Sequence, residues 1–195
     1  MSRLPQATLI LSTLLASWLG MQLVHEVGHV LGAWVSGGAV ARMVWHPLTI
    51  SRTDLAANPH PLLVVWAGPL MGTVAPLFLW LSAAFRNLRG AFVLRFFAGF
   101  CLIANGFYIG VGSFERVGDC GDMLRHGSPI WTLWAFGLLS VPLGFVLWHR
   151  QATSLGIGVA GVPGGSVDRG VAIGTAIVAT LLVIAGWITG SLISD

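Results

Sequence analysis

Two histidines and a glutamate lie within five positions, in the segment His25-Glu26-Val27-Gly28-His29. Residues four positions apart lie on the same face of an α-helix, so both imidazoles can bind one Zn²⁺ ion. Glu26 then stands beside a water that such a metal activates, and its carboxylate can accept the proton of that water. The pattern predicts a metalloprotease centre with His25 and His29 as metal ligands and Glu26 as the catalytic residue.

The motif lies within an apolar stretch, where ionisable groups are costly. Placing a central Asp or Arg in a membrane helix costs roughly 2.5–3.5 kcal/mol. The alternative to a metal site is a purely structural role, because polar side chains in such helices sometimes only form hydrogen bonds to neighbouring helices. Three ionisable groups within five positions favour the metal site.

Composition defines the class of protein. Hydrophobic residues make up 55% of the chain and charged residues 9%, and the mean hydropathy is +0.83. We therefore expect an all-α polytopic membrane protein embedded in the lipid bilayer. We expect that membrane to be a bacterial or archaeal cell membrane. All ten basic residues are Arg, and they are scattered, which argues against nucleic-acid binding. Stretches long enough to span a bilayer run over about 7–35, 62–85, 91–113, 129–148 and 171–193.

A third metal ligand is expected from the loop over 114–128. Strict alternation of five spans puts this loop, the loop over 36–61 and the C-terminus on the membrane side nearer His25 and His29. Catalytic zinc takes three protein ligands and a water, so one acid from this side would complete the set. Asp119 is favoured because Gly118 and Gly121 flank it in what we predict to be a tight turn. The acids on this side are Asp54, Glu115, Asp119, Asp122 and Asp195.

Small residues recur every four positions on two of the expected helices. Gly28, Gly32 and Ser36 do so on the first, and Gly106 and Gly110 do so on the third. Such faces let membrane helices approach closely. We expect them to bring the two histidines near the end of the third helix.

Three segments together resemble a known family. The HEVGH segment, Ala67-Gly68-Pro69-Leu70 and Asp119-Cys120-Gly121-Asp122-Met123-Leu124 are similar to the motifs of the site-2 protease family of intramembrane zinc metalloproteases. The resemblance covers about residues 21–125 and implies that His25, His29 and Asp119 bind zinc, with Glu26 catalytic. It implies an endopeptidase that hydrolyses a peptide bond in or near the transmembrane segment of a membrane-anchored protein. The chain would be a minimal form, without a PDZ-like insert.

The chain departs from the family pattern at three positions. Cys120 follows the aspartate where the family usually has Gly, and Gly72 replaces an Asn that often closes the second motif. An Asn-x-x-Pro element usually lies shortly before the aspartate, whereas Asn105 lies farther back and lacks the Pro of that element. These departures leave Asp122 as an alternative third ligand. The resemblance implies that Gly68, Pro69 and Asn105 bind substrate.

The segment over 39–53 mixes apolar and polar residues near period two, around His46-Pro47. This pattern predicts a short re-entrant β-hairpin after the first helix, which could bind an extended substrate by strand addition. His46 and His60 are expected on the surface. Tryptophans near helix ends, among them Trp34, Trp45 and Trp148, are expected to anchor the chain at the membrane interface.

The expected organisation is a single membrane-embedded domain over 1–195. Its catalytic core would be the three helices over 7–125, and the helices over 129–195 would support them. The alternative to a protease is a non-catalytic membrane protein, either a small-solute or metal carrier or an inactive protease-like scaffold. Carriers often show inverted internal repeats, and no convincing repeat is visible here.

Overall fold

Five long helices dominate the fold of the computed structural model, which describes residues 3–158 and 163–191. All five are long and apolar enough to cross a membrane. The predicted class, an all-α polytopic membrane protein with five spans, is confirmed, although positions 192–193 of the last expected span lie outside the described residues. The long helices are α1 (Leu4–Val35), α2 (Pro61–Phe85), α3 (Ala91–Glu115), α5 (Ile130–Trp148) and α6 (Arg169–Ser191).

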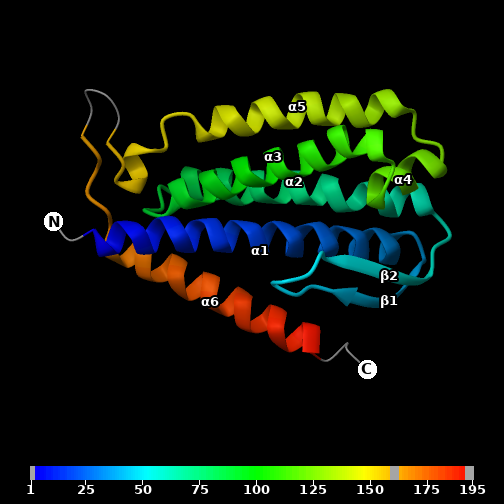
Figure 1. The fold of residues 1–195 in the computed structure, drawn as a ribbon, viewed down its shortest axis with the longest axis horizontal. Helices are drawn as coiled ribbons and strands as arrows, with labels where there is room; N and C mark the ends of the chain where they lie inside the picture. Colours follow the sequence, from blue (N-terminus) through cyan, green and yellow to red (C-terminus); the bar gives the residue numbers. More distant parts are fainter. Residues whose placement is uncertain (1–2, 159–162, 192–195) are drawn as a thin grey trace.

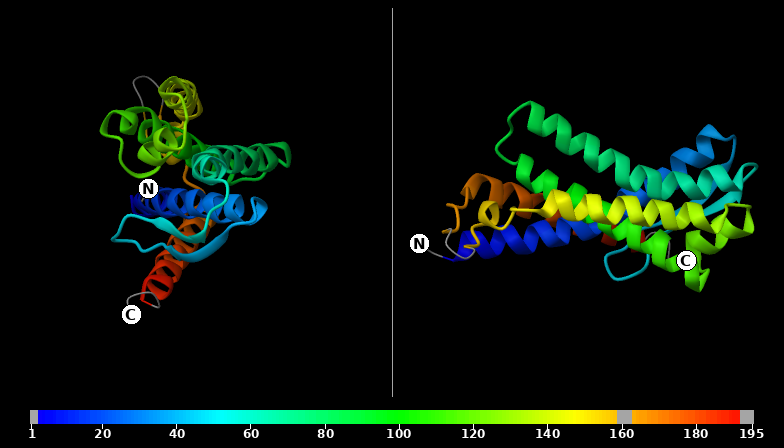
Figure 2. Two further views of the ribbon diagram at one scale, coloured as in Figure 1. Left: turned by 90° about the vertical axis from the view of Figure 1, so that its right-hand side faces the viewer. Right: turned by 90° about the horizontal axis from the view of Figure 1, so that it is seen from above.

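Four of the long helices run alongside one another, while α6 crosses α1 and leans away from the rest (Figures 1 and 2). The main contacts join α3 to α5, α1 to α2, α1 to α6 and α2 to α3. A 3₁₀ turn, η1 (Thr153–Leu155), lies in the connection between α5 and α6. The helices α5 and α6 carry none of the predicted site residues.

The small-residue faces of α1 and α3 pack against different neighbours. A Cβ on Gly28 would overlap the backbone of α2, lying 2.9 Å from the Cα of Gly68. A Cβ on Gly110 would instead lie 3.1 Å from the Cα of Gly137 on α5. His25 and His29 do lie beside the segment that follows α3, as expected, since both contact Asp119. The glycine faces themselves pack against α2 and α5 and do not pair α1 with α3. Each face lets its own helix approach a different partner at backbone distance.

The predicted hairpin is present, with strands β1 (Ala39–Val44) and β2 (Arg52–Ala57) paired antiparallel. Its second strand continues beyond the expected end at Thr53. Trp45 follows β1 and is only 3% exposed, and its indole N–H donates to the carbonyl of Leu19, 3.3 Å away in the middle of α1. The hairpin therefore reaches back to the centre of the bundle. Trp45 is a buried anchor of this hairpin and not a residue of the membrane interface.

The loop expected over 114–128 contains a short helix, α4 (Gly118–Arg125). Arg116 and Gly118 both have positive φ, 54° and 56°, which turns the chain sharply between α3 and α4. Cys120 and Met123 of α4 are fully buried and pack with Ile109 of α3. Asp119 therefore lies in the first turn of a helix, and the expectation of a glycine-flanked turn around it is wrong.

Candidate metal centre

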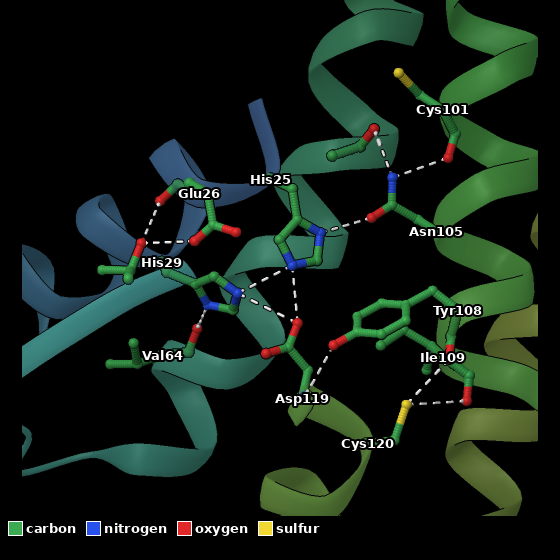
Figure 3. A network of polar contacts seen from close by, with 12 residues as sticks. His25, Glu26, His29, Val64, Cys101, Asn105, Tyr108, Ile109, Asp119 and Cys120 are labelled. Carbon is green, nitrogen blue, oxygen red and sulfur yellow. Dashed lines mark hydrogen bonds and ion pairs between the residues drawn. The ribbon is translucent and has the colours of Figure 1, made fainter. Parts of the chain in front are cut away.

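The side chains of His25, His29 and Asp119 converge on one point, as Figure 3 shows. The Nε2 atoms of the two histidines are 3.0 Å apart. Asp119 Oδ2 lies 2.8 Å from His25 Nε2 and 3.3 Å from His29 Nε2. The histidines come from consecutive turns of α1, and the aspartate comes from α4, ninety-four positions after His25. The fold thus assembles three ligand-type groups from two distant segments.

Asn105 of α3 fixes the orientation of the His25 imidazole. Its side-chain amide nitrogen donates to the carbonyls of Cys101, at 2.9 Å, and Gly72, at 3.4 Å. Its amide oxygen must therefore face His25 Nδ1, 2.7 Å away, and this contact requires a hydrogen on Nδ1. The Nε2 atom of His25 is left with a free lone pair for a metal.

The His29 imidazole is oriented in the same way by a backbone carbonyl. His29 Nδ1 lies 2.9 Å from the carbonyl oxygen of Val64 in α2, so Nδ1 carries the hydrogen and Nε2 carries the lone pair. A ligand histidine typically donates its second ring N–H to a carbonyl or carboxylate in this manner. Both imidazoles are thus held in the tautomer that a metal ligand needs.

The spacing of the three atoms suits a metal ion. Two nitrogen ligands about 2.0–2.1 Å from a tetrahedral ion lie about 3.3 Å apart. The separations at this site, 2.8, 3.0 and 3.3 Å, are within a few tenths of an ångström of that value. Two lone pairs and a carboxylate so close together repel one another unless a cation lies between them. The buried His25–His29–Asp119 group can therefore hold a metal ion.

Asp119 is held in the charged form that a ligand requires. Burial alone would raise the pKa of its carboxyl group, but hydrogen bonds from a proton on Nε2 of His25 or His29, in the place that a metal ion would take, outweigh burial and hold this pKa well below its usual range. Cys120 differs, because burial and the neighbouring Asp119 charge raise the pKa of its thiol to about 11. The thiol donates to the carbonyl of Tyr108 at 3.1 Å, so Cys120 ties α4 to α3.

The other acids expected on this side lie apart from the group. Asp122, the alternative ligand, forms an ion pair with Arg125 and is half exposed. Asp54 pairs with Arg42 across the hairpin. Glu115 is exposed at the end of α3, and Asp195 lies outside the described residues. Asp119 is thus the acid that the fold brings to the histidines.

Glu26 lies beside the group and is 3% exposed. Its Oε2 atom accepts a hydrogen bond from the hydroxyl of Thr53, 2.7 Å away on β2. This contact joins the hairpin directly to the HExxH motif (Figure 3 shows the Glu26 side chain). Thr53 lies within the predicted hairpin, but no feature of the sequence marks it as a functional residue.

The three residues predicted to bind substrate differ in position. Gly68 lies against His29, where a Cβ would overlap the Nε2 and Cε1 atoms of the imidazole ring. Pro69 is fully buried within α2. Asn105 holds His25 and also lines the cavity at the site. Gly68 and Asn105 therefore support the two imidazoles, and substrate binding by these three residues stays a prediction.

A cavity of about 920 Å³ opens beside the metal-binding group. Its walls include Gln22, Glu26 and both histidines on α1, the hairpin over 47–53, and Tyr108 and Asp119. Tyr108 is a cavity residue that the sequence analysis missed. The available signal was weak: it is the only tyrosine in the chain and lies three positions after Asn105 on α3.

Comparison of the chain with family models, curated proteins and solved structures yields no match. The class of protein therefore follows from the fold and the site themselves. The chain is a multi-pass α-helical membrane protein with a buried His/His/Asp group that can hold a metal ion.

Proposed function

We propose that this protein is an intramembrane zinc endopeptidase that hydrolyses a peptide bond in or near the transmembrane segment of a membrane-anchored protein. The observation that carries the proposal is the convergence of His25 Nε2, His29 Nε2 and Asp119 Oδ2 beside Glu26, in the wall of a cavity among membrane helices. The resemblance to the site-2 protease motifs supports the same conclusion.

Zinc is the ion that best suits this donor set. Two neutral imidazoles and one carboxylate are a usual set for catalytic zinc, with a further position left for water or substrate. When bound by His25, His29 and Asp119, zinc supplies Lewis-acid chemistry, since it lowers the pKa of water and polarises a carbonyl group. The repulsion among the three donor atoms is the feature that the ion would relieve.

Glu26 would act as the general base and then as the general acid. Its carboxylate accepts a proton from the attacking water and delivers that proton to the leaving amide nitrogen. Thr53 occupies one carboxylate oxygen, which leaves the other oxygen for proton transfer. Because Glu26 follows His25 directly, any movement of α1 carries base and ligand together.

The cavity and the hairpin support an extended polypeptide as substrate. A volume of about 920 Å³ lies near the upper end for ligand sites and far exceeds the needs of an ion and a water. Peptide bonds within a helix are shielded by the surrounding turns, so a transmembrane substrate must unwind before attack. The hairpin beside the cavity offers a strand with which an unwound segment can pair.

The test is a cleavage assay with the zinc-loaded protein in liposomes. A panel of single-span membrane peptides is reconstituted with the protein, and mass spectrometry identifies the products. Wild type should cleave at least one peptide, and Glu26→Gln should abolish cleavage while zinc stays bound. Glu115→Gln is the matched control, because Glu115 is the only other glutamate and is exposed. Equal cleavage by wild type and Glu26→Gln, or a purified protein that binds no zinc, would refute the proposal.

A metal carrier would behave differently in the same liposomes. It would move zinc across the bilayer, and Glu26→Gln would leave this movement unchanged as long as the metal still bound. Measuring zinc inside the liposomes therefore separates the carrier from the endopeptidase.

A further inference from the structure

Tyr108 presents a hydroxyl group to the cavity beside the metal-binding group. Its side chain is 42% exposed and lines the cavity. The ring meets the His25 imidazole edge to face, with centroids 6.0 Å apart. Figure 3 shows Tyr108 and Glu26 on opposite sides of the His25–Asp119 pair. The phenol thus faces the proposed base across the metal-binding group.

The hydroxyl oxygen of Tyr108 is held in place from one side only. It accepts a hydrogen bond from the backbone N–H of Asp119 at 3.1 Å. Gly118 makes room for it, because a Cβ on Gly118 would overlap the hydroxyl oxygen. Among the described residues, no side chain or carbonyl accepts the hydrogen of this hydroxyl group. The phenol is therefore oriented by the chain while its own hydrogen stays available for a ligand in the cavity.

We propose that Tyr108 donates a hydrogen bond to the oxyanion that forms during peptide hydrolysis, an inference that rests on the endopeptidase function proposed above. As Glu26 takes a proton from the attacking water, the water oxygen bonds to the carbonyl carbon, and the electron pair of the carbonyl double bond moves onto the carbonyl oxygen. Tyr108 stabilises this negative oxygen and keeps its proton. When the bond from carbon to nitrogen breaks, the electron pair returns to re-form the carbonyl, and Glu26 protonates the nitrogen.

A phenol is well suited to this role. It keeps its proton at neutral pH and donates a single directed hydrogen bond. A donor that is already oriented towards developing charge needs no reorganisation during the reaction. Removal of one oxyanion donor typically lowers kcat about 10²–10³-fold, and we expect about 100-fold for Tyr108→Phe.

The first experiment compares Tyr108→Phe with wild type on a peptide that wild type cleaves. We expect kcat to fall about 100-fold, KM to change by less than about threefold, and the bound zinc to stay at one ion per chain. The zinc measurement matters because Tyr108 also contacts the backbone of Asp119. Zinc loss in proportion to the loss of activity would show that Tyr108 acts by positioning Asp119, and would overturn the inference.

The second experiment measures binding without turnover. A phosphonamidate analogue of the cleaved peptide imitates the tetrahedral oxyanion, and it should bind Tyr108→Phe about 100-fold more weakly than wild type. The intact peptide should bind Glu26→Gln and the double variant Glu26→Gln/Tyr108→Phe equally well. Equal binding of the phosphonamidate to wild type and Tyr108→Phe would overturn the inference.

The outcomes separate the two proposals. If wild type cleaves and Tyr108→Phe cleaves equally well, the oxyanion role fails and the endopeptidase stands. If wild type cleaves nothing, or Glu26→Gln has no effect on cleavage, the endopeptidase fails and the role of Tyr108 fails with it.

Discussion

The α3–α4 side of the metal centre is packed more tightly than the hairpin side. On the α3–α4 side, the Asp119 backbone bonds to Tyr108, the Cys120 thiol bonds back to α3, and Met123 is fully buried. On the hairpin side, the Thr53 hydroxyl reaches the carboxylate of Glu26 and, at 3.5 Å, its backbone carbonyl. Leu48 and Ile50 at the tip are 78% and 90% exposed. We therefore propose that the tightly packed side holds the metal-binding Asp119 in place and that the looser hairpin side receives the substrate.

The helices that pack against each side show the same difference in packing. Behind α3, the glycines of α3 and α5 meet at backbone distance, since a Cβ on Gly137 would lie 3.0 Å from the Cα of Gly110. The hairpin tip instead rests on the end of the leaning helix α6, where the Thr189 hydroxyl donates to the Trp45 carbonyl at 3.1 Å and Trp187 meets His46. Changes that remove Asp119 or the support of His25 by Asn105 on the α3–α4 side should therefore alter zinc content, and changes on the hairpin side should alter turnover alone.

The largest effect is expected from loss of a ligand. His25→Ala and Asp119→Ala should each weaken zinc binding more than about 100-fold, because removal of a residue that merely supports a ligand already costs 10–100-fold. Bound zinc per chain is measured by mass spectrometry of the metal after dialysis. Asp122→Ala is the control and should keep wild-type zinc, since Asp122 pairs with Arg125. Equal zinc in all of these variants would refute the site.

A methyl group added against a ligand should have the next largest effect. In Gly68→Ala, the new Cβ would overlap the His29 imidazole, so the ring must move. We expect zinc affinity to fall about 10–100-fold and the free energy of unfolding to drop by roughly 1–3 kcal/mol. The control is Gly174→Ala on α6, where no heavy atom of the described residues lies within 4 Å of the added Cβ. Equal zinc affinity in the two variants would contradict this role of Gly68.

Removal of the side-chain amide that orients His25 should weaken zinc binding somewhat less. Asn105→Leu keeps the approximate volume of the side chain and deletes the hydrogen bond to His25 Nδ1. Zinc affinity, measured by competition with a chelator, should fall about 10-fold. Phe107→Leu, a change at an exposed position of α3, is the control. An unchanged affinity in Asn105→Leu would show that the His25 ring needs no such support.

Much of this arrangement could be predicted from the sequence, because it depends on local patterns. Long apolar runs determine the five spans, and one helical turn necessarily aligns His25 with His29. The sequence could not reveal α4, because its eight residues include two glycines and its stability comes from burying Cys120 and Met123. The partners of the glycine faces could not be predicted either. The spacing of small residues predicts close helix packing, but it does not identify the helix that packs there.

A substitution on the hairpin side should lower the cleavage rate and leave the zinc content unchanged. Thr53→Val removes the hydroxyl that bonds Glu26 and keeps the shape of the side chain. Cleavage by this variant should fall several-fold to about 10-fold at unchanged zinc content, because the base is less well oriented. Thr53→Ser, which restores the hydroxyl, should recover most of the activity. A loss of zinc in Thr53→Val would show that the two sides are not independent.

The smallest effect concerns the ion pair across the hairpin. The hydrogen bond from Arg42, aided by Arg52, lowers the pKa of the Asp54 carboxyl group. The stabilisation is therefore present above the ordinary pKa of Asp, about 3.9, and is lost as pH falls through the lowered pKa. Both side chains are more than a third exposed, so the pair contributes well under about 1 kcal/mol.

Amide hydrogen exchange of β1 and β2 measures this effect. Wild-type hairpin protection should decrease slightly as pH falls below about 4. The Asp54→Asn variant should show the slightly lower protection at every pH. Identical protection in the two proteins near neutral pH would show that the pair does not stabilise the hairpin.

The glycine contacts between α1 and α2 have a mechanical consequence. Gly28 rests on the backbone of Ala67 and Gly68, and Gly68 in turn gives room to the His29 ring. Sliding one helix along the other by a single residue, about 1.5 Å, would bring a side chain into that room. We therefore expect α1 and α2 to move as one rigid unit. The His29 imidazole should then keep its orientation when the thickness of the surrounding bilayer changes.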